Sequence, residues 1–245
     1  MTAHVYRFDD RTALNAAAAE KFTAAAVGAV DARGVFNVAL SGGSTPAGLF
    51  TLLATDPGFS SRIPWDRAQI FWSDERHVPP DSKDSNYRMA HETLLSRVPI
   101  GSGQVHRVQA EDPDAGAVAQ RYEEEIRSVI GRSASIPRFD LMLLGLGADG
   151  HTASLFPGTP ALTEARRLVV ANWVEAFAAY RITMTLPIIN AARLVMFLVA
   201  GMDKAIAVRD VLRSGGGGAV LPASLVRPTD GHEMWFLDAE AAMLL

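Results

Sequence analysis

The residues best suited to chemistry are a carboxylate and an imidazole placed two positions apart, Asp149 and His151, in the segment DGH. Histidine titrates near neutrality, so an imidazole can take a proton from water, and a neighbouring carboxylate can orient the ring and raise its basicity. A histidine alone in a loop is more often structural or simply exposed. We therefore interpret His151 as a candidate general base, and a structural role is the alternative that this pair alone leaves open.

A run of small residues, SGGSTP, could hold an anion. Thr45 is a good N-cap and Pro46 a good first helical residue, while the two glycines allow the backbone to approach a ligand closely. The free N–H groups of the resulting helix N-terminus would suit a phosphate. The run lacks the GxxxxGK[ST] pattern of a nucleotide P-loop, and a tight turn without a ligand is the alternative. The residues that would bind the phosphate are Gly42, Gly43, Ser44 and Thr45.

The charged segment DERH, residues 74–77, offers both signs of charge just after an apolar run. Asp74 could orient a reacting group and Arg76 could stabilise negative charge, whereas a solvated surface loop is the alternative. Asp74 and His77 could also join the DGH pair in a metal site, but no helical HExxH spacing supports this, and we expect no metal. Three further cations are candidates for ligand contacts, with ordinary surface charge as the alternative for each: Arg88, Arg181 and Lys204.

The glycines of residues 145–150 formally match the dinucleotide-binding pattern GxGxxG after a strand. Asp149 would place a carboxylate beside the pyrophosphate, and Pro157 and Pro160 would interrupt the long helix that should follow. We therefore reject a nicotinamide cofactor for this segment.

Short apolar runs alternate with helical patterns along the chain, which predicts an α/β fold with a mostly parallel sheet and helices on both faces. Runs such as LMLL are apolar throughout, as in strands buried on both faces. The expected strands are residues 35–40, 69–72, 139–144, 168–173, 181–185, 194–200 and 234–237. The expected helices are residues 12–32, 46–54, 86–96, 114–130 and 203–213.

Four polar or glycine-rich segments each follow the carboxyl end of an expected strand. Open α/β sheets bind ligands in the crevice outside the carboxyl ends of their strands. We therefore expect these segments to converge on one pocket. They are residues 41–46, 73–77, 145–152 and 201–204.

The composition limits the classes of function that remain. The chain has 245 residues, a formal net charge of −4 and no cysteine, which disfavours nucleic-acid binding and excludes thiol chemistry. Its first residues do not resemble a secretory signal, and its longest apolar stretch, 194–200, is far below the roughly 20 residues that span a bilayer. We expect a single cytoplasmic domain over residues 1–245, without a membrane partner. The glycine run at 215–218 is interpreted as a flexible loop or a flap near the site.

Together these motifs resemble the 6-phosphogluconolactonase family, whose three-layer, Rossmann-like fold is shared with glucosamine-6-phosphate deaminases. The order of the motifs spans residues 40–205, most of the chain. The matching segments are LSGGSTP (40–46), WSDERHVP (72–79), SNYR (85–88), LGLGADGHTASLFP (144–157), RITMTLPIIN (181–190) and GMDKA (201–205). One departure lies at residues 174–180, which read VEAFAAY where many relatives carry a Pro- and Lys-rich stretch.

The resemblance implies hydrolysis of 6-phosphoglucono-1,5-lactone, a sugar-phosphate lactone, without an organic cofactor. It implies that His151 is the base, that the GGST loop holds the phosphate, and that Arg76 and Lys204 supply positive charge, with Arg181 a third cation. Our hypothesis is that either Asp74 or Asp149 orients these groups. We expect a monomer or a small homo-oligomer.

Two alternatives remain from the same residues. An aminosugar-phosphate deaminase on this scaffold would favour Asp-Glu-Tyr where residues 74–76 read DER. A non-catalytic sugar-phosphate sensor would usually append a DNA-binding helix pair, for which this chain has little room or basic charge.

Overall fold

The computed structural model of the protein describes residues 3–131, 135–213 and 220–245, so the glycine run at 215–218 lies outside the described residues. Its main feature is a six-stranded sheet in which every neighbouring pair of strands is parallel. In spatial order the strands are β1 (His4–Phe8), β9 (His232–Asp238), β8 (Leu194–Val199), β5 (Leu141–Leu144), β2 (Phe36–Leu40) and β3 (Ala68–Trp72).

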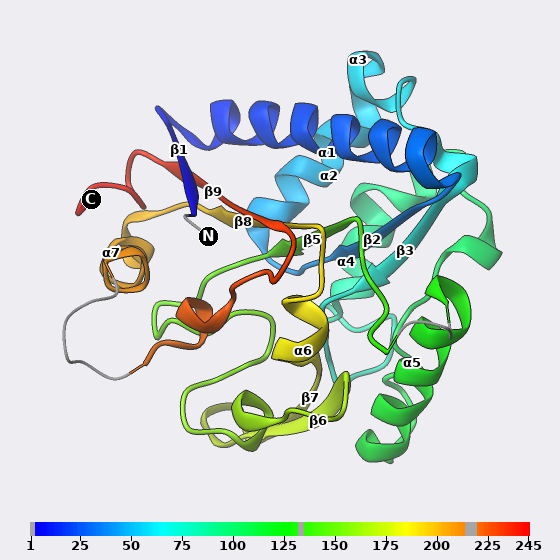
Figure 1. Cartoon of the computed structure of the whole chain (residues 1–245), viewed down its shortest axis with the longest axis vertical. Helices are drawn as coiled ribbons and strands as arrows, with labels where there is room; N and C mark the ends of the chain where they lie inside the picture. Colours follow the sequence, from blue (N-terminus) through cyan, green and yellow to red (C-terminus); the bar gives the residue numbers. More distant parts are fainter. Residues whose placement is uncertain (1–2, 132–134, 214–219) are drawn as a thin grey trace.

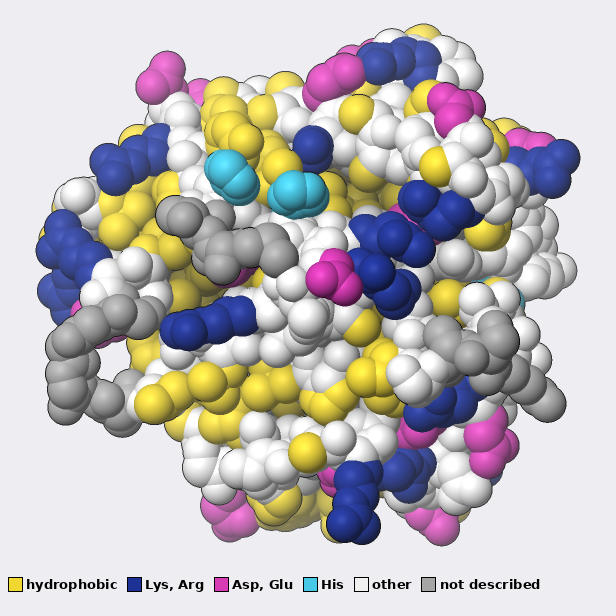
Figure 2. All heavy atoms as spheres, viewed as in Figure 1, with side chains coloured by type: hydrophobic (Ala, Val, Ile, Leu, Met, Phe, Trp, Pro, Cys, Tyr) yellow, Lys and Arg dark blue, Asp and Glu magenta, His cyan; other side chains and the backbone are white. Residues whose placement is uncertain are grey.

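Helices cover both faces of this sheet, as Figure 1 shows with α1 and α2 on one side and α5, α6 and α7 on the other. The helices are α1 (Arg11–Arg33), α2 (Ser44–Thr55), α3 (Pro57–Ser60), α4 (Asn86–Thr93), α5 (Ala115–Ile130), α6 (Leu186–Ile189) and α7 (Ala205–Leu212). No helix in the described ranges is long and apolar enough to cross a bilayer. On the face shown in Figure 2, Lys and Arg side chains lie in small groups among Asp and Glu side chains.

The apolar strands of the sheet are buried on both faces, as the sequence predicts. In β5, Leu141 and Leu143 pack with α1 and α2, whereas Met142 and Leu144 pack with α5 and α7. All four side chains are fully buried. Successive side chains of a strand point to opposite faces, so an unbroken apolar run is what a sheet between two helical layers requires.

The strand order places a switch point between β2 and β5. The chain leaves β2 towards its neighbour β3, and it leaves β5 towards β8 on the other side. Connections that diverge in this way open a crevice at the carboxyl ends of the two central strands, where ligands of open α/β sheets bind.

A second, antiparallel sheet lies below the main one in Figure 1 and consists of β4 (Asp74–Arg76), β7 (Ala179–Met184) and β6 (Val169–Val174). We expected residues 73–77 to be a loop, and this prediction is wrong for the three residues that pair with β7. We also did not predict β1, because its side chains are largely exposed and its register comes from pairing with β9. The short helices α3 and α6, of four residues each, were not predicted either. The remaining helices and strands agree with the predicted ranges to within a few residues.

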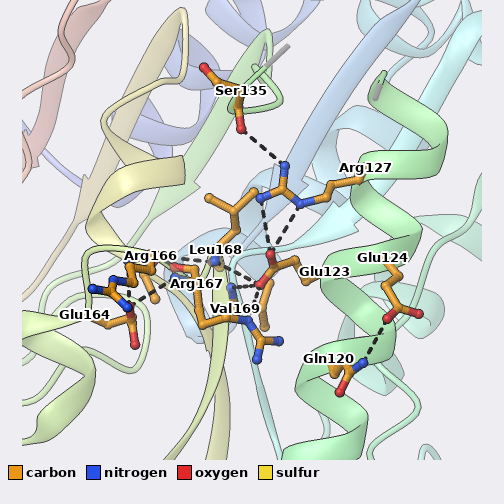
Figure 3. Close-up of polar contacts among 11 residues, drawn as sticks. Gln120, Glu123, Glu124, Arg127, Ser135, Glu164, Arg166, Arg167, Leu168 and Val169 are labelled. Atoms are coloured by element: carbon orange, nitrogen blue, oxygen red, sulfur yellow. Dashed lines mark hydrogen bonds and ion pairs between the residues drawn. The ribbon is translucent and has the colours of Figure 1, made fainter. Parts of the chain in front are cut away.

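A buried carboxylate joins α5 to the start of β6 (Figure 3). The side chain of Glu123 accepts hydrogen bonds from Arg167 Nε at 2.9 Å and from the N–H groups of Leu168 and Val169 at 3.0 and 3.4 Å. Its other oxygen lies 3.2 Å from Nη2 of Arg127. Glu123 therefore fixes the second sheet against the helical layer that covers the first.

We predict that Glu123→Ala lowers the free energy of unfolding by about 2 kcal/mol, since it leaves the N–H groups of Leu168 and Val169 without their acceptor. Glu124→Ala is the matched control, because Glu124 is exposed and its carboxylate bonds only Gln120 among the described residues. Urea unfolding followed by circular dichroism measures both. Equal effects of the two substitutions would contradict the role of Glu123.

The lowered pKa of Glu123 predicts that its contribution to the free energy of unfolding depends on pH. Burial acts to raise the pKa of Glu123, but the hydrogen bonds from Arg167, Leu168 and Val169 outweigh it, and the pKa is lowered from 4.5. A carboxyl whose pKa is lower in the folded state stabilises the fold above its unfolded pKa, and this contribution is lost as the pH falls through the folded-state value. The stability difference between wild type and Glu123→Ala should therefore shrink below about pH 4.5.

Candidate active site at the carboxyl ends of the central strands

One cavity of about 320 Å³ opens at the carboxyl ends of β2, β5 and β8. Its volume falls in the range of about 300 to 1,000 Å³ that is typical of small-molecule sites. All four segments that we expected to converge contribute to it, and they do so across the switch point of the sheet. The lining comprises residues 41–46, Asp74, Arg76, Asn86, residues 145–147, 151–153 and 198–200, and Lys204.

The imidazole of His151 faces this cavity and is held by Asp149. Nδ1 of His151 lies 2.5 Å from Oδ1 of Asp149. Partial burial acts to raise the pKa of Asp149, but the hydrogen bond with His151 and the charge of the ring outweigh it, so the pKa is lowered from 3.8. An ionised carboxylate accepts the Nδ1 proton, which leaves the lone pair on Nε2. Nε2 makes no hydrogen bond to any residue that the structure describes.

A tight turn between residues 147 and 151 presents this histidine. The N–H of Gly147 donates to the carbonyl of His151 at 2.8 Å, and the N–H of Gly150 donates to the carbonyl of Gly147 at 2.9 Å. The imidazole lies directly on Gly147, where a Cβ would come within 2.0 Å of Nδ1. Only glycine leaves this space, so Gly147 allows the imidazole of His151 to lie against the backbone.

The glycine-rich turn after β2 leads into α2, whose first turn has no side-chain cap among the described residues. We expected Thr45 to be the N-cap, but Gly43 holds that position and α2 begins at Ser44. The φ of Gly43 is +108°, a left-handed value that turns the chain into the helix two residues early. Among the described residues no side chain caps the first turn, and Gly43, Ser44 and Thr45 line the cavity, so the unpaired N–H groups of this turn are available to an anion.

Asp74 connects three segments at the wall of the cavity. Its Oδ2 accepts a 2.6 Å hydrogen bond from Ser154 Oγ, and its backbone carbonyl accepts one of 2.9 Å from Asn86 Nδ2. The side chain is 8% exposed. Asp74 is therefore fixed by the segment that follows His151 and by the first residue of α4.

The next residue, Glu75, is buried beside the N-terminus of α4. Its carboxylate accepts hydrogen bonds from the N–H groups of Arg76, Asn86 and Tyr87 and from Ser85 Oγ. Burial raises the pKa of Glu75, and the backbone N–H groups offset part of this rise. The carboxylate supplies negative charge at a helix N-terminus and thereby holds α4 against β4.

Arg76 and Arg181 are register partners on β4 and β7. Arg76 lines the cavity, and its Nη1 donates to the carbonyl of Asp84 at 2.7 Å. Arg181 does not line the cavity: its guanidinium lies 5.1 Å from the ring centre of Phe177. Burial lowers the pKa of Arg181, and the neighbouring charge of Arg76 acts in the same direction.

Lys204 reaches the opposite side of the cavity from the turn that follows β8. The turn is held by Asp238, whose carboxylate accepts the N–H of Gly201 at 3.0 Å. Nζ of Lys204 lies 2.9 Å from Oδ2 of the exposed Asp203. A weak surface ion pair of this kind leaves the ammonium available to a ligand.

Two further candidates from the sequence, besides Arg181, do not line the cavity. Nε of Arg88 donates to the carboxylate of Glu92 at 2.7 Å and its Nη1 donates to the carbonyl of Asp81, and the residue does not line the cavity. This arrangement follows from its position on α4, because Glu92 lies one helical turn away. His77 faces the carbonyl of Asp112 at 2.7 Å. In residues 3–131, 135–213 and 220–245, no cluster of His, Asp and Glu side chains is arranged to hold a metal ion.

Three polar residues of the site are not among the individual residues that the sequence singled out. Asn86 lines the cavity and Ser154 bonds Asp74, as described above. Ser41 also lines it, is 3% exposed, and its hydroxyl has no hydrogen-bond partner within the described part of the chain. A buried polar group without a partner is costly, so a ligand oxygen is a natural partner for Ser41. Its position directly before the glycines was the available signal.

Comparison with known proteins gives a consistent result. The model of the family of glucosamine-6-phosphate isomerases and 6-phosphogluconolactonase matches residues 9–235. The 6-phosphogluconolactonase of Synechocystis sp. is 41% identical over 214 residues, 87% of this chain and 86% of that protein. A solved 6-phosphogluconolactonase from Trypanosoma cruzi has a TM-score of 0.88 and 30% identity, covering 100% of this chain and 98% of its own. These matches confirm the predicted fold class.

A solved structure of lower sequence identity also has a similar fold. A monomeric glucosamine-6-phosphate deaminase has a TM-score of 0.79 at 22% identity, over 99% of this chain and 100% of its own. This likeness concerns the fold alone.

We predict that inorganic phosphate binds in the cavity and that Lys204→Ala weakens its binding roughly tenfold, because a hydrogen bond to a charged group is lost. Isothermal titration calorimetry at low ionic strength measures the change. Lys21→Ala is the control of equal charge, since Lys21 lies on α1, which contributes no residue to the cavity. Equal affinities of the two variants would show that phosphate does not contact Lys204.

Proposed function

The chain belongs to the family of glucosamine-6-phosphate isomerases and 6-phosphogluconolactonase, and from this membership we propose that it hydrolyses 6-phosphoglucono-1,5-lactone to 6-phosphogluconate in the oxidative pentose phosphate pathway. The observation that carries the proposal is the content of the cavity. The 320 Å³ cavity is lined by His151, whose Nε2 has no hydrogen-bond partner among the described residues, by the N-terminus of α2 and by Lys204. The first suits proton transfer, and the other two suit a phosphate that does not react.

In the proposed mechanism, His151 activates the attacking water. Nε2 takes a proton from water as its oxygen bonds to the lactone carbonyl carbon, and Asp149 stabilises the imidazolium through Nδ1. The tetrahedral intermediate collapses with cleavage of the bond between the carbonyl carbon and the ring oxygen. The ring oxygen leaves as a hydroxyl after it receives the proton from His151, and the product is a carboxylic acid that ionises.

Arg76 is the proposed partner of the carbonyl oxygen as it becomes negative. Its guanidinium lines the cavity on the β4 side, where Asp84 fixes one of its nitrogens. Donors that are already in place before the reaction stabilise a developing oxyanion without reorganising. Arg76 also distinguishes this chain from the Asp-Glu-Tyr sequence that we expect of a deaminase.

The phosphate is proposed to bind at Gly42, Gly43, Ser44 and Thr45, with Lys204 as its cation. Its binding energy would fix the far end of the sugar and so place the lactone carbonyl near His151. The hydroxyl of Ser41 would donate to an oxygen of the same ligand. Asp74, which Ser154 and Asn86 hold in place, would stabilise the wall of the pocket and take no part in the proton transfer.

We predict that His151→Gln lowers kcat by about 10² to 10⁴, the usual contribution of a general base, and leaves KM within a few-fold. The measurement is the disappearance of freshly generated lactone against its spontaneous hydrolysis. His91→Gln, at an exposed position of α4, is the control. Near wild-type turnover of His151→Gln would exclude it as the base, and release of ammonia from glucosamine 6-phosphate would decide for a deaminase.

We predict that Asp149→Asn lowers kcat by roughly 10- to 100-fold, because an amide does not hold the same tautomer of His151 or stabilise its charge. The measurement is the same lactone assay, and a wild-type kcat in Asp149→Asn would contradict this role of Asp149.

A further inference from the structure

The imidazole of His151 is held by a second contact besides Asp149. Its ring stacks on the ring of Phe156 with the centres 4.1 Å apart and the planes at 27°. Phe156 lies five positions further along the same loop and is 9% exposed. One face of the imidazole is therefore covered by a buried aromatic side chain.

Phe156 is in turn packed by the tip of the β6–β7 hairpin. Phe177 meets it edge-on, with the ring centres 5.8 Å apart and the planes at 68°. The guanidinium of Arg181 lies over the ring of Phe177. A continuous row of contacts thus leads from Arg181 through Phe177 and Phe156 to His151.

A hydrogen bond to Asp149 alone does not define the plane of the imidazole. It fixes the position of Nδ1, while the side chain of Asp149 is 49% exposed and leaves the ring free to tilt about that bond. Contact with Gly147 limits the ring on the backbone side. The stack on Phe156 supplies the remaining constraint, since offset aromatic pairs have a preferred geometry.

We propose that Phe156 is a positioning residue for the proposed lactone hydrolysis: it fixes the ring plane of His151 so that Nε2 points into the cavity, and Phe177 holds Phe156 in place. The inference rests on the proposed function only for its effect on rate. The stacking itself is a property of the free protein. A general base that is displaced from its position transfers the proton more slowly, but the substrate still binds with the same affinity. Loss of the stack should therefore lower kcat and leave KM unchanged.

The kinetic test compares Phe156→Leu, which removes the ring, with Phe156→Tyr, which keeps it. We expect Phe156→Leu to lower kcat about 3- to 10-fold, the scale of one aromatic pair, with KM unchanged within about twofold. Phe156→Tyr should restore most of the rate. Phe8→Leu is the matched control, because Phe8 stacks on Phe236 at 5.6 Å and lines no part of the cavity.

A spectroscopic test needs no substrate. In the wild type, ring currents from Phe156 should shift the imidazole protons of His151 upfield, and the resonances are assigned by their loss in His151→Gln. They should move downfield in Phe156→Leu and stay in place in Phe156→Tyr and in Phe8→Leu. A substitution that merely loosened the fold would not be rescued by tyrosine in both measurements.

The outcomes separate this inference from the proposed function. A wild-type protein that does not accelerate lactone hydrolysis would overturn the function, while the resonances would still decide whether Phe156 orients His151. With an active wild type, unchanged kcat in Phe156→Leu would overturn the inference. A lower kcat with unmoved His151 resonances would overturn it as well, because the ring would then act on another group.

Discussion

The parallel sheet is buried between two helical layers, and this burial determines where polar side chains can lie. The side chains along β5 are fully buried and apolar, so no polar group could be placed there without losing its solvation. Polar chemistry is therefore confined to the ends of the strands. Because all neighbouring strands of the main sheet are parallel, their carboxyl ends lie at one edge, and the turns after β2, β5 and β8 share one cavity.

The edge of the sheet is organised by buried carboxylates and not by apolar packing. Asp74 receives the hydroxyl of Ser154, Glu75 receives the N-terminus of α4, and Asp238 receives the N–H of Gly201. The bonds of Asp74 and Asp238 join segments that are distant in the chain, and the bond of Glu75 joins β4 to the helix that follows it. Apolar burial thus holds the sheet, whereas hydrogen bonds to carboxylates hold the turns at its edge. The ring contacts of Phe177, Phe156 and His151 add a third kind of contact beside the cavity.

The sequence predicts the central strands and the convergence of their turns because both follow from local patterns: apolar runs, and glycines or polar residues directly after them. It does not predict β1 or β4, whose register is set by β9 and β7. The same limit explains Arg181, which the second sheet turns towards Phe177. Thr45 is not the N-cap because the φ of Gly43 starts α2 two residues earlier. The contact between Phe156 and His151 exists only in the folded chain, and no local sequence pattern indicates it.

The uncapped start of α2 connects occupancy of the site to folding. Within the described part of the chain, the first turn of this helix lacks the side-chain acceptor that a Ser, Thr, Asp or Asn N-cap would supply. An anion bound there completes the helix as well as the complex, so part of the binding free energy is also folding free energy. If the proposed phosphate binds there, the resistance of the protein to heat and to proteolysis would rise with the concentration of its ligand.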